Sequence, residues 1–141
     1  MIWHIFYTSD KAIAWSSNAG IDERVINNEA AAGKSYVQVE QDDLPIAENY
    51  YVNAEGTGIS AKTAFSPTFS TTTPALDDTV AVTGLPTGTE VFIDGTSQGT
   101  LSASTLNLTF TEPGKYSIEF KKLENLDYLT LIETRRYGQW M

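Results

Sequence analysis

His4, the only histidine of the chain, is the first residue to consider as a catalytic base. A hydrolase holds such a base against a nucleophile, and no serine of this sequence stands in the G-x-S-x-G pattern that exposes one. His4 also lies inside the apolar run of residues 1–7, which is typical of a strand. We interpret His4 as a strand residue on the wet or half-buried face of an opening hairpin, and predict that the chain is not an enzyme.

Three carboxylates lie close together along the sequence, at Glu40, Asp42 and Asp43. Two carboxylates cleave a glycoside when they oppose each other at about 5 to 9.5 Å, which neighbours along one loop do not do. Neither this cluster nor the pair at 77–78 has the alternating ligand spacing and closing glutamate of a calcium loop. The run 56–58 (GTG) lacks the lysine and the helix that follow in a phosphate loop. We therefore predict no catalytic residues, no metal and no cofactor.

The charge balance disfavours anionic partners. Eighteen acidic residues against nine basic ones give a net charge of -9, which repels phosphate backbones and anionic membranes. Four basic residues lie close together, at Lys121, Lys122, Arg135 and Arg136, and we interpret them as a solvated face. We predict that the protein does not bind nucleic acid. The absence of cysteine excludes disulfides, thiolate zinc sites and thiol nucleophiles.

Targeting and membrane segments are not expected. The apolar start of the chain has no basic region and no small-residue cleavage site, so it is not typical of a signal peptide. No stretch approaches the ~20 apolar residues of a membrane span. We predict no membrane insertion.

The pattern of residues 1–62 predicts a small β-rich module. A turn at 8–11 separates two runs of β-branched and aromatic residues between Ile2 and Trp15, which indicates a hairpin. Residues 21–32 have near-helical spacing before a glycine, which predicts at most one short helix. Further strands are expected at 36–40 and 49–53, and these four or five strands would form one small sheet.

Residues 63–76 are predicted to be a linker. Nine of the twelve residues from Thr63 to Pro74 are Ser, Thr or Pro, a composition with little to bury and typical of an extended connector. Phe65 and Phe69 are exceptions, which would tie the segment either to a sheet or to a partner.

In residues 77–141, turn residues separate apolar runs at the regular intervals typical of an antiparallel sandwich. Strands are expected at 78–82, 90–93, 106–110, 116–120 and about 128–135, with turn residues between them. Three alternating rows predict the core: Val80, Val82, Leu106, Leu108, Phe110, Tyr116, Ile118 and Phe120. The predicted fold class is all-β, with the N-terminal β module followed by an immunoglobulin-like β-sandwich.

Two sequence runs resemble a known kind of module. Residues 82–95 (VTGLPTGTEVFIDG) and 109–118 (TFTEPGKYSI) resemble hairpins of the small bacterial Ig-like modules in virion proteins of tailed phages, and surface-anchored PEGA-type modules share their turn placement. Residues 50–56 (YYVNAEG) resemble the segment before such modules in short tail and fibre-associated proteins. The resemblance covers roughly residues 50–133. It implies a structural virion protein of the tail, a fibre or the capsid, made in the host cytoplasm and assembled with other virion proteins in symmetric copies or as a homo-oligomer.

Aromatic residues in excess of what two thin cores need are candidates for partner binding. They are Trp3, Trp15, Tyr50, Tyr51, Phe65, Phe69, Tyr137 and Trp140. Core packing is the competing interpretation for the first two, whereas Trp140 is expected to dock into another chain. Because aromatic platforms also stack on sugars, a host-surface glycan is a possible ligand. A glycan-binding adhesion module is therefore one alternative to a tail protein. A capsid decoration protein is another, since the resemblance does not distinguish the parts of the virion.

Overall fold

The computed structural model describes residues 1–135, which form two compact units. The first extends from Met1 to Thr63, and the second begins at Ala64. Both are built from antiparallel sheets, so the prediction of an all-β fold is confirmed.

The first unit is organised around a three-stranded sheet in the order β2-β1-β3. Its strands are β1 (Ile2–Tyr7), β2 (Ile13–Ser17) and β3 (Ser35–Glu40), and the first two form the predicted hairpin. An irregularity in the β1–β2 register places Trp15 opposite Phe6 but Ile13 opposite Tyr7. Because side chains alternate between faces, Trp15 and Ile13 lie on opposite faces of the sheet.

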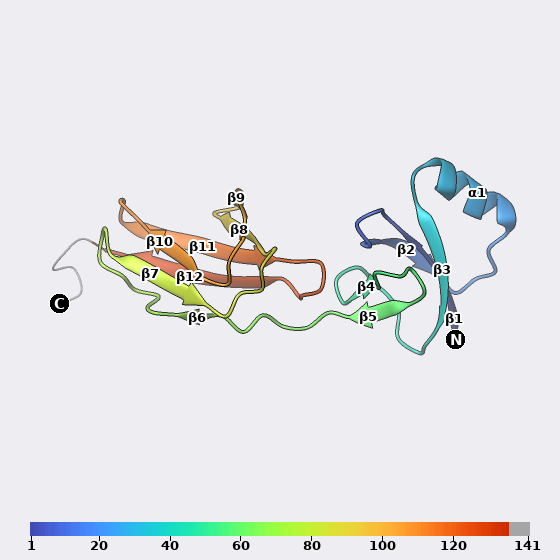
Figure 1. Cartoon of the computed structure of the whole chain (residues 1–141), viewed down its shortest axis with the longest axis horizontal. Helices are drawn as coiled ribbons and strands as arrows, with labels where there is room; N and C mark the ends of the chain where they lie inside the picture. Colours follow the sequence, from blue (N-terminus) through green and yellow to red (C-terminus); the bar gives the residue numbers. More distant parts are fainter. Residues whose placement is uncertain (136–141) are drawn as a thin grey trace. The chain divides into compact units, whose positions relative to one another are not determined.

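One short helix, α1 (Glu23–Ala31), connects β2 to β3, as the spacing predicts. Asp22 caps its N-terminus, since its Oδ1 accepts a hydrogen bond of 2.7 Å from the Arg24 N–H. Gly33, with a φ of +87°, follows its C-terminus. Figure 1 shows α1 beside β3, on the side away from the hairpin of β4 (Tyr50–Val52) and β5 (Ile59–Ala61).

The core of the first unit lies on one face of the sheet. Its buried residues are Trp3, Ile5, Tyr7, Ile13, Val37 and Val52. The last of these comes from β4, which pairs with β5 and not with the three-stranded sheet. The expected single sheet is therefore wrong, and β5 was not foreseen because it contributes only one large apolar residue, Ile59.

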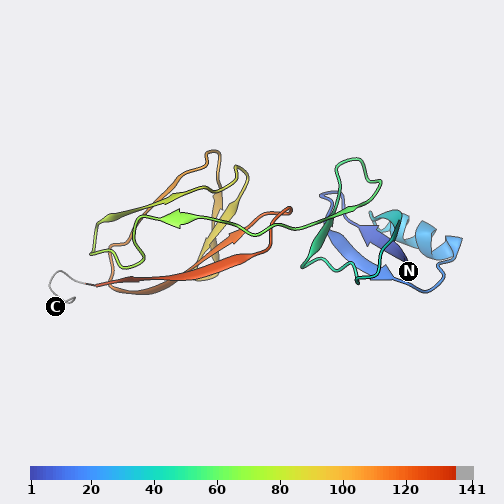
Figure 2. The ribbon, with the colours of Figure 1, turned by 90° about the horizontal axis from the view of Figure 1, so that it is seen from below.

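The second unit is a sandwich of two sheets (Figures 1 and 2). One has the order β10-β7-β6, with β6 (Thr68–Phe69), β7 (Thr79–Thr83) and β10 (Leu106–Thr109). The other has the order β12-β11-β8-β9, with β8 (Glu90–Ile93), β9 (Thr96–Thr100), β11 (Gly114–Lys121) and β12 (Tyr128–Thr134). If β6, β7, β8, β10, β11 and β12 are lettered A, B, C, E, F and G, and β9, which pairs with β8, is called C′, an A-B-E sheet packs on a G-F-C-C′ sheet. This is an immunoglobulin-like arrangement.

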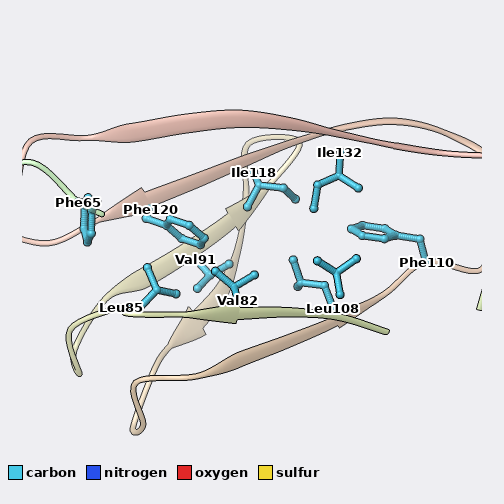
Figure 3. Close-up of a cluster of buried hydrophobic side chains, with 10 residues drawn as sticks. Phe65, Val82, Leu85, Val91, Leu108, Phe110, Ile118, Phe120 and Ile132 are labelled. Atoms are coloured by element: carbon cyan, nitrogen blue, oxygen red, sulfur yellow. The ribbon is translucent and has the colours of Figure 1, made fainter. Parts of the chain in front are cut away.

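The core between these two sheets follows the predicted rows closely. Six of the eight predicted residues are buried, whereas Leu106 and Tyr116 are partly buried at its border. Figure 3 shows the side chains from both sheets pointing toward one another. Four buried members lie outside the predicted rows: Phe65, Leu85, Val91 and Ile132.

From Ala64 onward, the linker predicted at 63–76 is part of the second unit. Phe65 is buried in its core, and β6 pairs with β7 through Thr68 and Phe69. Beyond β6 the chain reaches the edge of β12, where the carbonyl of Thr72 accepts a hydrogen bond of 2.9 Å from the Glu133 N–H. The composition was misleading because threonine forms strands readily, and the two phenylalanines share one face of an extended chain.

Candidate interaction surfaces

The first unit carries an aromatic row on the sheet face opposite its core. Phe6 stands between Trp15 and Tyr36 in the strand register. Its ring centroid lies 4.3 Å from that of Trp15 and 5.2 Å from that of Tyr36. Phe6 is fully buried, whereas the other two rings are half-buried. The row therefore leaves a tryptophan and a tyrosine partly exposed to solvent.

His4 extends this row along β1. Its ring stacks on that of Tyr36 with centroids 5.8 Å apart, and its Nδ1 is hydrogen-bonded with the Tyr36 hydroxyl. His4 is half-buried on the face that also carries Phe6, as expected for an alternating strand residue. Its visible role is to hold Tyr36 in place beside Phe6.

Two of the predicted partner-binding aromatics are core residues, so those predictions are corrected. Trp3 packs against the core of the first unit, and its Nε1 donates a hydrogen bond of 3.1 Å to the carbonyl of Gln41. Phe65 packs on Phe120 in the second unit, with ring centroids 6.1 Å apart. Each keeps only 7% of its surface exposed, which leaves no area for a partner.

The remaining predicted aromatics are half-buried. Phe69 packs beside Phe120 and Tyr128, with ring centroids 6.2 Å and 6.4 Å away, and thus borders the core. Tyr50 packs against the core of the first unit, while Tyr51 is half-buried on the alternate side of β4. Of the predicted set, Trp15 and Tyr51 therefore keep a half-exposed ring outside both cores. Tyr137 and Trp140 lie outside the described residues.

The acidic segment near residue 43 is a hydrogen-bonded loop. The carbonyl of Asp43 accepts 2.8 Å from the Gln41 side chain, and its Oδ2 accepts 3.5 Å from the Tyr50 hydroxyl. Within residues 1–135, no three His, Asp or Glu side chains are grouped so that they could hold a metal ion. In the same range, no helix has both the length and the apolar character needed to cross a membrane.

Two exposed carboxylates have shifted titrations for local reasons. The side chain of Arg24, and then its backbone N–H, hold the pKa of Asp22 below its ordinary value. A hydrogen bond from the Thr8 hydroxyl lowers the pKa of Asp10 in the turn between β1 and β2. Both shifts come from turn and cap hydrogen bonds, so they indicate local structure and not a reactive centre.

The most exposed leucines of the chain lie on β12 and were missed by the sequence analysis. Leu129 is 66% exposed and Leu131 is 59% exposed. They stand opposite Glu119 and Ser117 of β11, on the outer face of the four-stranded sheet. A strand with one wet face alternates apolar with polar residues. The run 128–132 (YLTLI) departs from this alternation, and this departure is the signal of exposed leucines. This run is apolar on both faces.

No family model, no curated protein and no solved structure matches the chain. The segments that resemble phage Ig-like modules have a geometric role in this fold. Asp94 and Gly95, with φ of 50° and 80°, make the tight turn between β8 and β9, where both central residues need positive φ. The Asp94 carboxylate also accepts a hydrogen bond of 2.9 Å from the Ser117 N–H. The resemblance thus coincides with the turns that join the sandwich strands.

Proposed function

We propose that the protein is a structural component of a tailed-phage virion, located at the tail or its fibres and acting through protein-protein assembly. In this proposal the first unit anchors the chain, and the Ig-like unit faces outward. The observation that carries the assembly role is the leucine pair on β12, because contiguous exposed apolar side chains commonly mark interaction surfaces. The virion assignment rests on the resemblance of residues 82–95 and 109–118 to phage modules.

Immunogold electron microscopy tests the virion assignment. Antibodies raised against the purified chain should label intact particles of the phage that encodes it, at the tail or fibres. Labelling spread over the head would favour the capsid decoration protein instead. Particles that contain no peptide of this chain by mass spectrometry, although infected cells produce it, would contradict a virion role.

A glycan-binding adhesion module is the second candidate, and the aromatic row of the first unit favours it. Trp15 and Tyr36 are half-buried, and Tyr36 has an exposed polar neighbour, Gln38, on β3. Aromatic rings beside hydrogen-bonding groups are typical of small-molecule sites. Glycan-array binding that is lost in Trp15→Ala but retained in Leu131→Lys would support this function. Absence of binding by the wild-type chain would count against it.

A further inference from the structure

The edge of β12 exposes unpaired backbone groups. β12 is the outermost strand of its sheet and pairs only with β11. The Glu133 N–H points away from β11, since it donates to Thr72, and backbone direction repeats every two residues in an unbroken register. The N–H and C=O groups of Leu131 and Leu129 therefore also point outward. No group among residues 1–135 hydrogen-bonds them.

The free part of this edge is short and has definite ends. At one end, the segment around Thr72 covers Glu133, and the Leu76 N–H donates 3.2 Å to the carbonyl of Arg135. At the other end, the strand begins only at Tyr128. Between these points the edge has no proline, no bulge and no lysine, the features that natural proteins use to prevent edge pairing.

We propose that the β12 edge pairs with the β12 edge of a second copy of this chain, antiparallel and about a two-fold axis at Thr130. Leu129 then lies opposite Leu131 of the second copy, and the reverse pair is equivalent. The outward N–H and C=O groups of these residues form four reciprocal hydrogen bonds, and the two sheets become one continuous sheet. This partner assignment rests on the proposed assembly function and specifies its first contact.

A second copy fits this edge for three reasons. An identical strand supplies a donor and an acceptor at the same two-residue spacing, so every outward group of the two leucines is satisfied. The pairing places leucine beside leucine on the outer face, where each now meets water. Finally, the axis at Thr130 sets the covered Glu133 of one copy opposite residue 127 of the other. That residue precedes β12, so the covering segment does not meet a strand.

Cysteine cross-linking tests both the contact and its register. Opposed residues in a non-hydrogen-bonded antiparallel pair have Cα atoms about 4.5 Å apart, within the range of a disulfide. Because the chain has no cysteine, Thr130→Cys introduces a single thiol on the axis. Under mild oxidation, Thr130→Cys should form covalent dimers faster than Leu129→Cys, whose equivalents lie diagonally apart. Leu44→Cys, an exposed leucine of the first unit, measures random collision.

Dimerisation of Thr130→Cys no faster than Leu44→Cys would overturn the proposal, and faster cross-linking of Leu129→Cys than of Thr130→Cys would overturn its register. If Thr130→Cys fails to fold, amide exchange of the wild-type chain decides. Exchange at Leu129 and Leu131 should slow as protein concentration rises, and concentration-independent exchange at both would refute the pairing. Neither result bears on labelling of phage particles, so the virion assignment stands or falls separately.

Discussion

Gly56→Ala should destabilise the first unit through a contact with a single buried side chain. Gly56 has a φ of +71°, and a Cβ atom there would lie 2.6 Å from the hydroxyl oxygen of Tyr7. Left-handed backbone costs an alanine about 1–2 kcal/mol, and forcing a buried ring to move costs about 1–3 kcal/mol. The sum is about 2–5 kcal/mol, which is a large share of the ~3–9 kcal/mol expected for a unit of this size.

Urea unfolding followed by the fluorescence of Trp3 and Trp15 measures this loss in the first unit. Replacing Trp140 by Phe in every variant removes the third tryptophan from the signal. The matched control is Gly20→Ala, because an added Cβ at Gly20 meets nothing within 4 Å and its backbone is not left-handed. Gly20→Ala should unfold at nearly the wild-type urea concentration, whereas Gly56→Ala should unfold well below it.

Tyr7→Phe provides the internal check on the steric part. It removes the hydroxyl and leaves ring atom Cζ at 3.7 Å from the added methyl group, an ordinary contact. The double variant Gly56→Ala/Tyr7→Phe should therefore recover the steric cost and keep only the ~1–2 kcal/mol of backbone strain. Wild-type stability of Gly56→Ala, or no recovery in the double variant, would refute the reasoning.

Two further predictions concern the core of the second unit and the helix cap. Phe120→Ala removes a fully buried ring that contacts Phe65 and Phe69, and should cost about 3–5 kcal/mol in chemical denaturation followed by circular dichroism; a cost below 1 kcal/mol would contradict the assigned core. The lowered pKa of Asp22 means that its carboxylate stabilises the folded state above the ordinary value near 4. This contribution should be lost as pH falls through the folded pKa, which NMR of the α1 amides detects, and Asp22→Asn, which still caps but does not titrate, should weaken that pH dependence.

Local patterns predicted most elements of the fold, because alternation and turn residues act over short distances. Asp94-Gly95 predicted its hairpin correctly, and the alternation of Leu108 with Phe110 identified inward-facing residues. The Ser/Thr/Pro content of 63–76, averaged over the segment, predicted a linker and missed β6, although Phe65 and Phe69 stood out as residues that would tie the segment to a sheet or to a partner. The β4–β5 hairpin is local, and its second strand was missed because Ile59 is its only large apolar residue. That this hairpin stays separate from the β2-β1-β3 sheet depends on long-range packing, which single-sequence patterns do not encode.

The candidate surfaces were less accessible to sequence reasoning than the fold. Aromatic type alone did not distinguish the buried Trp3 from the half-buried Trp15, because the difference depends on the sheet face and on the neighbours that cover each ring; Phe6, on the same face as Trp15, is fully buried. Leu129 and Leu131 were predicted only as part of the last strand, because the sequence does not show that they lie on the uncovered outer face of the sheet. Exposure of an apolar side chain in a sheet depends on which face the other layer covers, and this becomes visible only in three dimensions.

The mass of the full-length chain in solution, measured by light scattering over a wide concentration range, tests the assembly claim most directly. The wild-type mass should rise from 15.5 kDa toward twice that value as concentration increases. Leu131→Lys places a charge beside the paired edge and should remain a single chain. Leu44→Lys, which makes the same exposed substitution in the first unit, should follow the wild type. A wild-type mass that stays at 15.5 kDa at the highest attainable concentration, or equal behaviour of the two lysine variants, would contradict the claim.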